Sequence, residues 1–151
     1  MSDNQFVVFK LGNEKYGVDI LNVGGISEYL DITKVPDAPW FIEGIINLRG
    51  DIIPVVNLEK RFNIPVKEID SESRIIIIKI QGKDIGFLVD EASQVLRIES
   101  EDIEDAPEII KGKDHDYISG VGKYEGQIII LLDLVKVLNA EEAAQVIQLK
   151  E

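Results

Sequence analysis

The feature that most constrains the fold of this chain is an internal repeat. Residues 50–63, GDIIPVVNLEKRFN, align with residues 126–139, GQIIILLDLVKVLN, 76 positions later in a chain of 151 residues. Gly44-Ile45 matches Gly120-Val121 at the same offset, and Tyr16-Gly17-Val18 matches Ile85-Gly86-Phe87 more loosely. Hairpins in general share such patterns, but a duplication also solves a physical problem, because a unit of about 70 residues has a thin core by itself. We therefore expect two similar halves packed together.

Short apolar runs separated by turn residues dominate the sequence, which is typical of β structure. Several runs are apolar almost throughout, which indicates burial on both faces, as in small closed barrels. Two short helices are predicted at 57–62 and 133–138, each beginning with a capping Asn or Asp, and a longer one at 141–149 with Ala143, Ala144 and Ile147 at helical spacing. Segment 21–29 permits a helical turn, which Gly24-Gly25 weakens. Strands are predicted at 6–11, 15–20, 44–48, 52–56, 74–80, 85–89, 95–98, 118–123 and 127–132.

Composition excludes several classes of function. The net charge of −12 disfavours binding to nucleic acid and to anionic membrane surfaces. The absence of cysteine excludes disulfides, thiolate metal sites and cysteine catalysis. The N-terminus lacks the basic region of a signal peptide, and the longest apolar run, 128–132, is far shorter than the ~20 residues of a membrane-spanning helix. We expect a cytoplasmic protein that binds no nucleic acid and does not insert into the membrane.

The residues that could carry chemistry are few. His115, the single histidine, lies in the charged run KDHDY with no nucleophile placed beside it by any motif. The acidic residues between Glu99 and Asp105 lack the spacing and central glycine of a calcium loop. Gly120-Val121-Gly122 precedes a turn and another strand, whereas a nucleotide-binding loop opens a helix. We predict no catalytic, cofactor-binding or metal-binding residue. The alternative is a small enzyme or ligand-binding barrel that uses a cleft between the halves, with His115 in it.

One exposed motif remains, the segment Asn47-Leu48-Arg49-Gly50 between two apolar runs. It predicts the tip of a hairpin, with the turn at Gly50-Asp51. The planar guanidinium of Arg49 suits a carboxylate or a main-chain carbonyl on a partner, although an arginine at such a tip can also serve solubility alone.

These same residues belong to a longer signature. Residues 32–36, ITKVP, and 38–58, APWFIEGIINLRGDIIPVVNL, resemble the signature of CheW-like domains, and segments 9–20, 86–90 and 128–133 extend the resemblance over nearly the whole chain. The resemblance implies a mainly β fold of two five-stranded SH3-like β-barrels packed side by side, with short helices and a C-terminal helix at 140–150. We expect a single domain over 1–151, with barrels at approximately 15–80 and 81–139. The N-terminal strand, 5–11, is able to pair with either barrel, the second included.

The resemblance also implies a function. CheW-like proteins are non-enzymatic adaptors that couple the cytoplasmic tips of methyl-accepting chemotaxis receptors to the histidine kinase CheA, at membrane-associated receptor arrays. By similarity, Arg49 and Asn47 in the hairpin, with Val23 and Ile26 in the preceding segment, are the expected receptor-binding residues. CheA is expected to bind through its regulatory domain, on the second barrel of this chain, with no residue assigned.

Two points qualify the expectation from the resemblance. Because the chain carries only this domain, we expect a free-standing coupling protein, largely monomeric alone, and no cofactor. A paralogue that serves another array or pathway, and a purely structural module that oligomerises through strand edges, are the alternatives. Gly24-Gly25 stands where many members carry a polar and an acidic residue, so the receptor assignment is weaker for Val23 than for Arg49.

Overall fold

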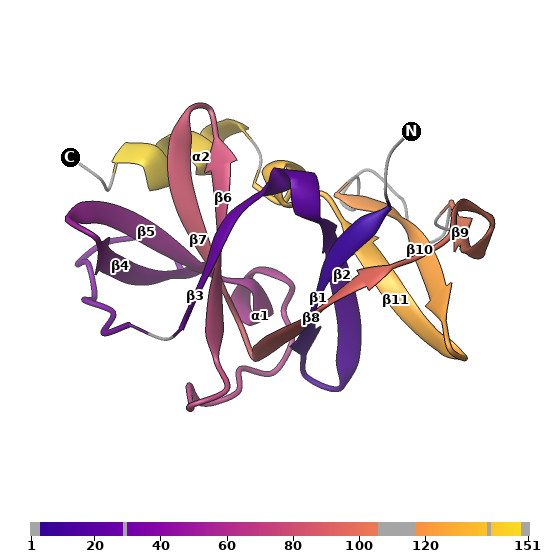
Figure 1. The fold of residues 1–151 in the computed structure, drawn as a ribbon. Coiled ribbons are helices and arrows are strands. Elements are labelled where there is room, and N and C mark those ends of the chain that lie inside the picture. Colours follow the sequence, from indigo (N-terminus) through magenta and orange to yellow (C-terminus); the bar gives the residue numbers. More distant parts are fainter. Residues whose placement is uncertain (1–3, 29, 106–116, 139, 149–151) are drawn as a thin grey trace.

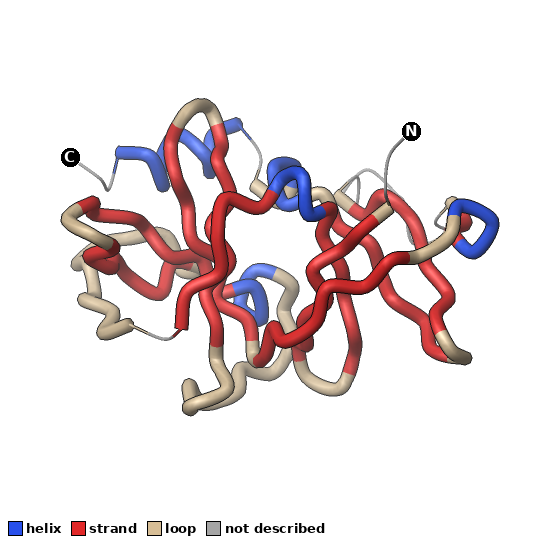
Figure 2. The backbone as a smooth tube through the Cα atoms, viewed as in Figure 1, coloured by secondary structure: helices blue, strands red, loops and turns tan. Residues whose placement is uncertain are grey.

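Strands dominate the computed structural model, which describes residues 4–28, 30–105, 117–138 and 140–148 (Figures 1 and 2). The mainly β fold predicted from the sequence is confirmed. The strands are β1 (Gln5–Leu11), β2 (Glu14–Asp19), β3 (Val23–Glu28), β4 (Ile42–Leu48), β5 (Asp51–Asn57), β6 (Arg74–Ile80), β7 (Lys83–Val89), β8 (Glu91–Arg97), β9 (Ile103–Glu104), β10 (Ile118–Tyr124) and β11 (Gln127–Leu132). The helices are α1 (Leu58–Arg61), α2 (Ala140–Gln148) and the 3-10 turns η1 (Ile20–Asn22), η2 (Ser100–Asp102) and η4 (Leu134–Lys136).

The strands form two sheets that lie side by side (Figure 1). One has five strands in the order β3-β6-β7-β5-β4, and the other has six in the order β8-β1-β2-β11-β10-β9. Each sheet is curved, and the chain that follows one edge strand pairs with the strand at the opposite edge. After β3, Thr33 exchanges two backbone hydrogen bonds of 2.8 Å with Ile45 of β4, and after β8 the short strand β9 pairs with β10. This geometry is compatible with two small barrels.

The predicted duplication is present in the structure at the same offset of 76 residues. The bulge at Ile42/Gly44 in β4 recurs at Ile118/Gly120 in β10. The parallel pair Val55–Gly86 recurs as Leu131–Gly17. The Gly17 motif therefore holds the same position in its sheet as the Gly86 motif holds in the other, as the looser sequence match suggested. In the second sheet the hairpin β1–β2 therefore occupies the position that β6–β7 occupies in the first.

The two sheets divide the chain differently from the boundaries expected at 15–80 and 81–139. The five-stranded half runs from β3 to β7, over 23–89, and the six-stranded half combines β1 and β2, over 5–19, with β8 to β11, over 91–132. The reason is that β1 pairs with both β2 and β8, so the whole β1–β2 hairpin belongs to the same sheet as β8.

Three apolar clusters explain why so many strands are apolar on both faces. One lies inside the five-stranded half and includes Ile75 and Ile77. A second lies inside the six-stranded half, and the largest lies between the halves, with members from both sheets. Along β6, Ile76 and Ile78 face the cluster between the halves while Ile75 and Ile77 face the interior of their own sheet. The continuous apolar run thus follows from alternation between two different cores.

Of two segments with an expected helix, one is mainly a strand and the other is a helix as predicted. Segment 21–29 contains only the turn η1 at its start and continues as strand β3, which was not predicted. The C-terminal helix is confirmed as α2, and it packs along the five-stranded half through Ala143 and Val146, which are buried, whereas Ala144 is exposed. An ion pair of 3.2 Å between Arg61 of α1 and Glu142 fastens it there.

The repeat offers a matched pair of helix caps for a stability prediction. The Asn57 side chain accepts a hydrogen bond from the backbone of Lys60 and donates one of 2.9 Å to Glu43, and it is 3% exposed. Asn57→Ala should lower the free energy of unfolding by about 1–2 kcal/mol, because a cap and a buried hydrogen bond are both lost. Asp133, at the equivalent position, caps only Val135 and is half-buried, so Asp133→Ala should cost less, about 0.5–1 kcal/mol. Urea denaturation of both variants measures the difference, and an equal or reversed order would contradict it.

Candidate protein-interaction site

The hairpin tip between β4 and β5 is a two-residue turn. Leu48 pairs with Asp51, so the turn residues are Arg49 and Gly50, one position earlier than expected, with φ of 54° and 90°. Gln81-Gly82 and Glu125-Gly126 adopt the same left-handed conformation at two other hairpins. This turn type matches the twist of the flanking strands, and the second residue is glycine because its φ is positive. The turn is therefore a general device of the fold, and the arginine is what distinguishes this tip.

The two candidate residues of the tip have different roles in the structure. The side-chain oxygen of Asn47 accepts a hydrogen bond of 2.9 Å from the backbone of Gly50, so Asn47 holds the turn together. Arg49 is exposed, and among the described residues no hydrogen bond or ion pair engages its guanidinium. Asn47 thus supports the shape of the tip, and Arg49 offers a charge that is available to a partner.

Val23 and Ile26 lie on the edge strand β3. Val23 pairs with Ile78 of β6 and Ile26 pairs with Ile76, while Gly24 is the extra residue of a bulge. Residues three apart in a regular strand point to opposite faces, but the bulge restores the same face for both. Cross-strand partners share a face, so Val23 and Ile26 both project to the side where β6 contributes to the cluster between the halves. Val23 packs against that cluster, and Ile26, on the same face, is 43% exposed.

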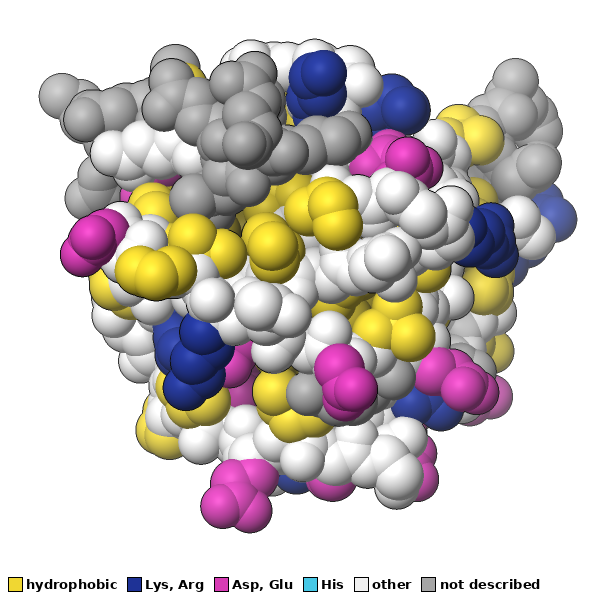
Figure 3. All heavy atoms as spheres, turned by 90° about the vertical axis from the view of Figure 1, so that its left-hand side faces the viewer, with side chains coloured by type: hydrophobic (Ala, Val, Ile, Leu, Met, Phe, Trp, Pro, Cys, Tyr) yellow, Lys and Arg dark blue, Asp and Glu magenta, His cyan; other side chains and the backbone are white. Residues whose placement is uncertain are grey.

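The four candidate residues therefore form two separate pairs. The strand order places β3 and β4 at opposite edges of the five-stranded sheet. Figure 3, which views the side of the molecule that carries β4 and β5 in Figure 1, shows apolar side chains across the middle of this face and charged ones around them. The exposed large apolar residues of this half, within the described chain, are Ile26, Trp40, Ile52 and Val66.

The sequence alone did not reveal β3 or its bulge. The apolar residues of this strand are diluted by Gly24, Gly25 and Ser27, so neither a two-residue nor a helical period is visible. An added methyl group at Gly25 would meet no atom within 4 Å, and one at Gly24 would meet the carbonyl of Ile77 at 3.5 Å. Gly24 and Gly25 thus leave an open surface beside Ile26.

The other candidate residues of the sequence carry no catalytic arrangement in the described part of the chain. His115 lies outside the described residues. In the acidic run, Glu99 pairs with Arg97, Glu104 pairs with Lys123, and the described residues contain no cluster of three potential metal ligands. Among these residues, no helix has the length and apolarity required to cross a bilayer.

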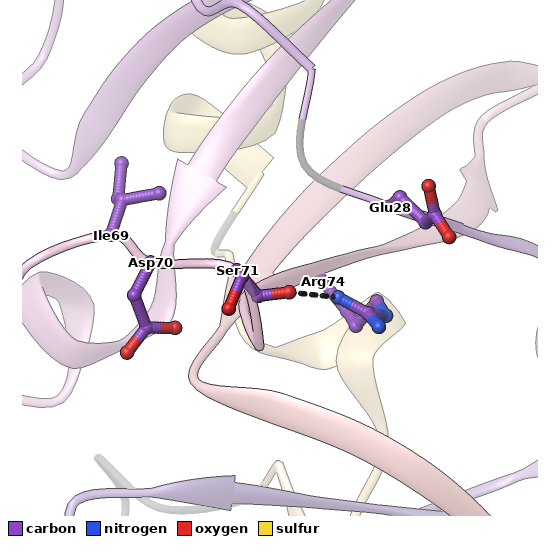
Figure 4. A pocket seen from close by; sticks show the side chains of 5 residues that line it. All are labelled: Glu28, Ile69, Asp70, Ser71 and Arg74. Carbon is purple, nitrogen blue, oxygen red and sulfur yellow. Dashed lines mark hydrogen bonds between the residues drawn. The ribbon is translucent and has the colours of Figure 1, made fainter.

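A surface hollow lies near the end of β3, and the polar side chains that line it mainly hold a loop in place (Figure 4). Arg74 lies between Ser71 and Glu28 in this view, and its guanidinium donates to the carbonyls of Ser71 and Ser73 at 2.9 and 2.8 Å. Those bonds fix the turn that precedes β6. Asp70, at the same hollow, accepts from the backbone of Glu72 at 2.8 Å, which holds the pKa of its carboxyl below the ordinary value.

Comparisons with known proteins find related sequences and a similar fold. The model of the CheW-like domain family matches residues 5–142. A chemotaxis protein CheW of Treponema pallidum is 34% identical, covering 94% of this chain and 87% of its own, and one of Klebsiella aerogenes is 37% identical, covering 94% and 86%. The crystal structure of the scaffolding protein TtCheW from Thermoanaerobacter tengcongensis is 38% identical and superposes with a TM-score of 0.83, covering 93% of this chain and 90% of its own.

The class of protein follows from these likenesses: a non-enzymatic scaffold that serves chemotaxis signalling. Within that class, the chain belongs to the CheW-like domain family, as the match over 5–142 establishes. Its partners are components of a chemotaxis signalling complex.

Proposed function

We propose that this chain couples the cytoplasmic tips of chemoreceptors to the regulatory domain of the histidine kinase CheA, and that it does so in the cytoplasm at receptor arrays. The observation that carries the proposal is the exposed Arg49 at a turn held by Asn47, within the segment that matches the family signature. Coupling in this sense requires that the chain bind the signalling and silent states of its partners with different affinities.

The receptor surface is proposed to consist of the hairpin tip and the β3 face. Arg49 supplies a guanidinium, which suits a carboxylate or a main-chain carbonyl at the end of a receptor helix. Ile26, exposed on the same face of β3 as Val23, supplies apolar surface for a helix, and Val23 packs against the cluster between the halves. Asn47 acts indirectly by keeping the turn in shape.

The kinase is proposed to bind the six-stranded half, away from the hairpin. The separation matters because an adaptor must hold two partners at once, and two distinct surfaces allow this without competition. No residue of that half is assigned to the contact. The chain alone is proposed to be largely monomeric, with part of the outer edge of β10 occupied by β9 and part of the outer edge of β4 occupied by the Thr33–Ile45 bridge.

Arg49→Ala should weaken binding to a receptor-tip fragment about tenfold, which corresponds to about 1.4 kcal/mol, and leave binding to the regulatory domain of CheA unchanged. Alanine keeps a Cβ at the positive φ of this position, so the strain of the turn stays comparable and the change removes chiefly the charged group. Calorimetric titration of wild type and variant with each partner measures both affinities.

The matched control is Arg97→Ala, which removes an exposed arginine from β8 in the other half. It should leave the receptor affinity within about twofold, because exposed ion pairs such as Arg97–Glu99 contribute little. Equal weakening by the two substitutions would mean that Arg49 contributes to receptor binding only through the net charge of the protein. Wild-type protein that binds neither partner would overturn the proposed function altogether.

A further inference from the structure

A pair of buried carboxyl groups lies where the two halves meet. Glu59, on α1, is 3% exposed, and Asp90, where the chain crosses from β7 to β8, is 8% exposed. Both accept a hydrogen bond from the same backbone N–H, that of Gly12, at 3.3 Å for Glu59 and 2.8 Å for Asp90. Gly12 belongs to the β1–β2 turn of the six-stranded half, so the pair connects this turn to α1 and to β7 of the five-stranded half.

Further bonds make the pair the centre of the junction. The other oxygen of Glu59 accepts from the backbone of Lys67 at 2.8 Å, which fixes the connection between α1 and β6. The backbone N–H of Asp90 donates to the carbonyl of Lys10 at 3.1 Å, next to the same β1–β2 turn. Four segments are thus joined through two carboxyl groups.

Both carboxyl groups accept from the N–H of Gly12, so their oxygens lie close to one another. Two ionised carboxylates are both acceptors and repel each other at close range, whereas a proton on one of them allows it to donate to the other. Burial, followed by the influence of Asp90, raises the pKa of Glu59 above its ordinary value, against the lowering effect of the N–H groups of Lys67 and Gly12.

Positive charge near the pair is limited. The Lys67 ammonium faces both carboxyl groups, but it is held on the surface by Asp70 at 3.3 Å. On α1, Lys60 is bound to Glu43 at 3.4 Å and Arg61 to Glu142 at 3.2 Å. The titratable groups on the elements next to the pair include Lys60 and Arg61 on α1, Lys67, Glu68, Asp70 and Glu72 on the connection to β6, Lys10, Glu14 and Lys15 beside the β1–β2 turn, and Glu91 at the start of β8.

We propose that Glu59 and Asp90 form a proton-dependent fastening between the two halves. With one proton shared, the pair holds the β1–β2 turn against α1 and β7. When the proton leaves, two buried negative charges compete for the N–H of Gly12, and their repulsion loosens the turn. The proton is released to solvent and no other group changes its state. This inference concerns the junction between the halves and does not depend on which partners the protein binds.

The sign of the pH dependence follows from the direction of the shift. A carboxyl group whose pKa is raised on folding binds more protons in the folded state, so its contribution to stability is complete below the ordinary value of 4.5 and is lost as the pH rises through the raised value. Wild-type protein should therefore lose resistance to urea as the pH increases from mildly acidic to mildly alkaline.

Glu59→Gln is the decisive variant, because its amide keeps the bond from Lys67 and donates permanently to Asp90. We expect the urea midpoint of Glu59→Gln to be higher than that of wild type at pH 8 and to change less between pH 4.5 and pH 8. Glu68→Gln is the matched control, because it removes the same charge from an exposed position on the connection between α1 and β6. It should follow the wild-type profile.

Two measurements test the proposal even if a variant folds poorly. Carbon-13 NMR of the wild-type protein reports the titration of the Glu59 carboxyl directly, and the amide hydrogen of Gly12 should shift in the same step and exchange several-fold faster above it. Asp90→Asn, which also supplies a permanent donor, should flatten the pH profile as Glu59→Gln does. Titration of Glu59 at the ordinary value, or parallel pH profiles for wild type and Glu59→Gln, would overturn the proposal.

Discussion

Gly44→Ala is expected to lower the free energy of unfolding by about 3 kcal/mol or more, one of the two largest effects that we predict for a single substitution. Gly44 lies at the bulge of β4 with a φ of 154°. A Cβ there would approach the carbonyl oxygen of Thr33 to 2.3 Å and the side chain of Ile32 to 2.6 Å. Relief would require moving backbone that is held by the two 2.8 Å bonds of the Thr33–Ile45 bridge.

The measurement is urea denaturation followed by far-ultraviolet circular dichroism. Gly25→Ala is the control, because it also adds a methyl group to a strand glycine but meets no atom within 4 Å. We expect that control to lie within about 0.5 kcal/mol of wild type. A Gly44→Ala protein as stable as the Gly25→Ala protein would show that Gly44 is not needed for the closure of the sheet.

Phe87→Ala is expected to cost about 3–5 kcal/mol, the range for removing a fully buried phenylalanine. Phe87 is 0% exposed and belongs to the cluster between the halves. It pairs with Val56 of β5 and Ile76 of β6, both members of the same cluster, so the surrounding strands are hydrogen-bonded on both sides and cannot collapse into the space. Removal of the Phe87 ring should therefore weaken the packing of one half against the other.

The same denaturation experiment measures this effect. Ile128→Ala, which truncates a side chain that is 65% exposed on β11, is expected to change the stability by less than about 0.5 kcal/mol. A loss below about 1.5 kcal/mol for Phe87→Ala would mean that the cluster between the halves repacks around the missing ring.

Much of the fold was accessible from local pattern. The match between residues 50–63 and 126–139 predicted the duplication because equivalent hairpins need the same turn glycine, the same apolar strand and the same polar cap. Asn57 and Asp133 are indeed the caps of α1 and η4. These features depend on neighbours in the chain, which is why a single sequence carries them.

The candidate site was predicted in part for the same reason. An arginine before a glycine, between two apolar runs, is sufficient to predict an exposed tip, and Arg49 is exposed in the structure. Whether Arg49, Asn47, Val23 and Ile26 bind a receptor stays a prediction. The common face of Val23 and Ile26 depends on the bulge at Gly24, which is created by pairing with β6, about 50 residues away along the chain.

The sequence by itself determined the class of fold, the repeat, most strands and the exposed arginine, since all of these follow from short-range periodicity and turn chemistry. Only the tertiary structure decided which strands share a sheet: β1–β2 takes the place in one half that β6–β7 takes in the other. It also brought Glu59, Asp90 and Gly12 together from positions 47 and 78 residues apart. Such contacts are set by how two cores pack against each other, and no local pattern in the chain encodes that distance.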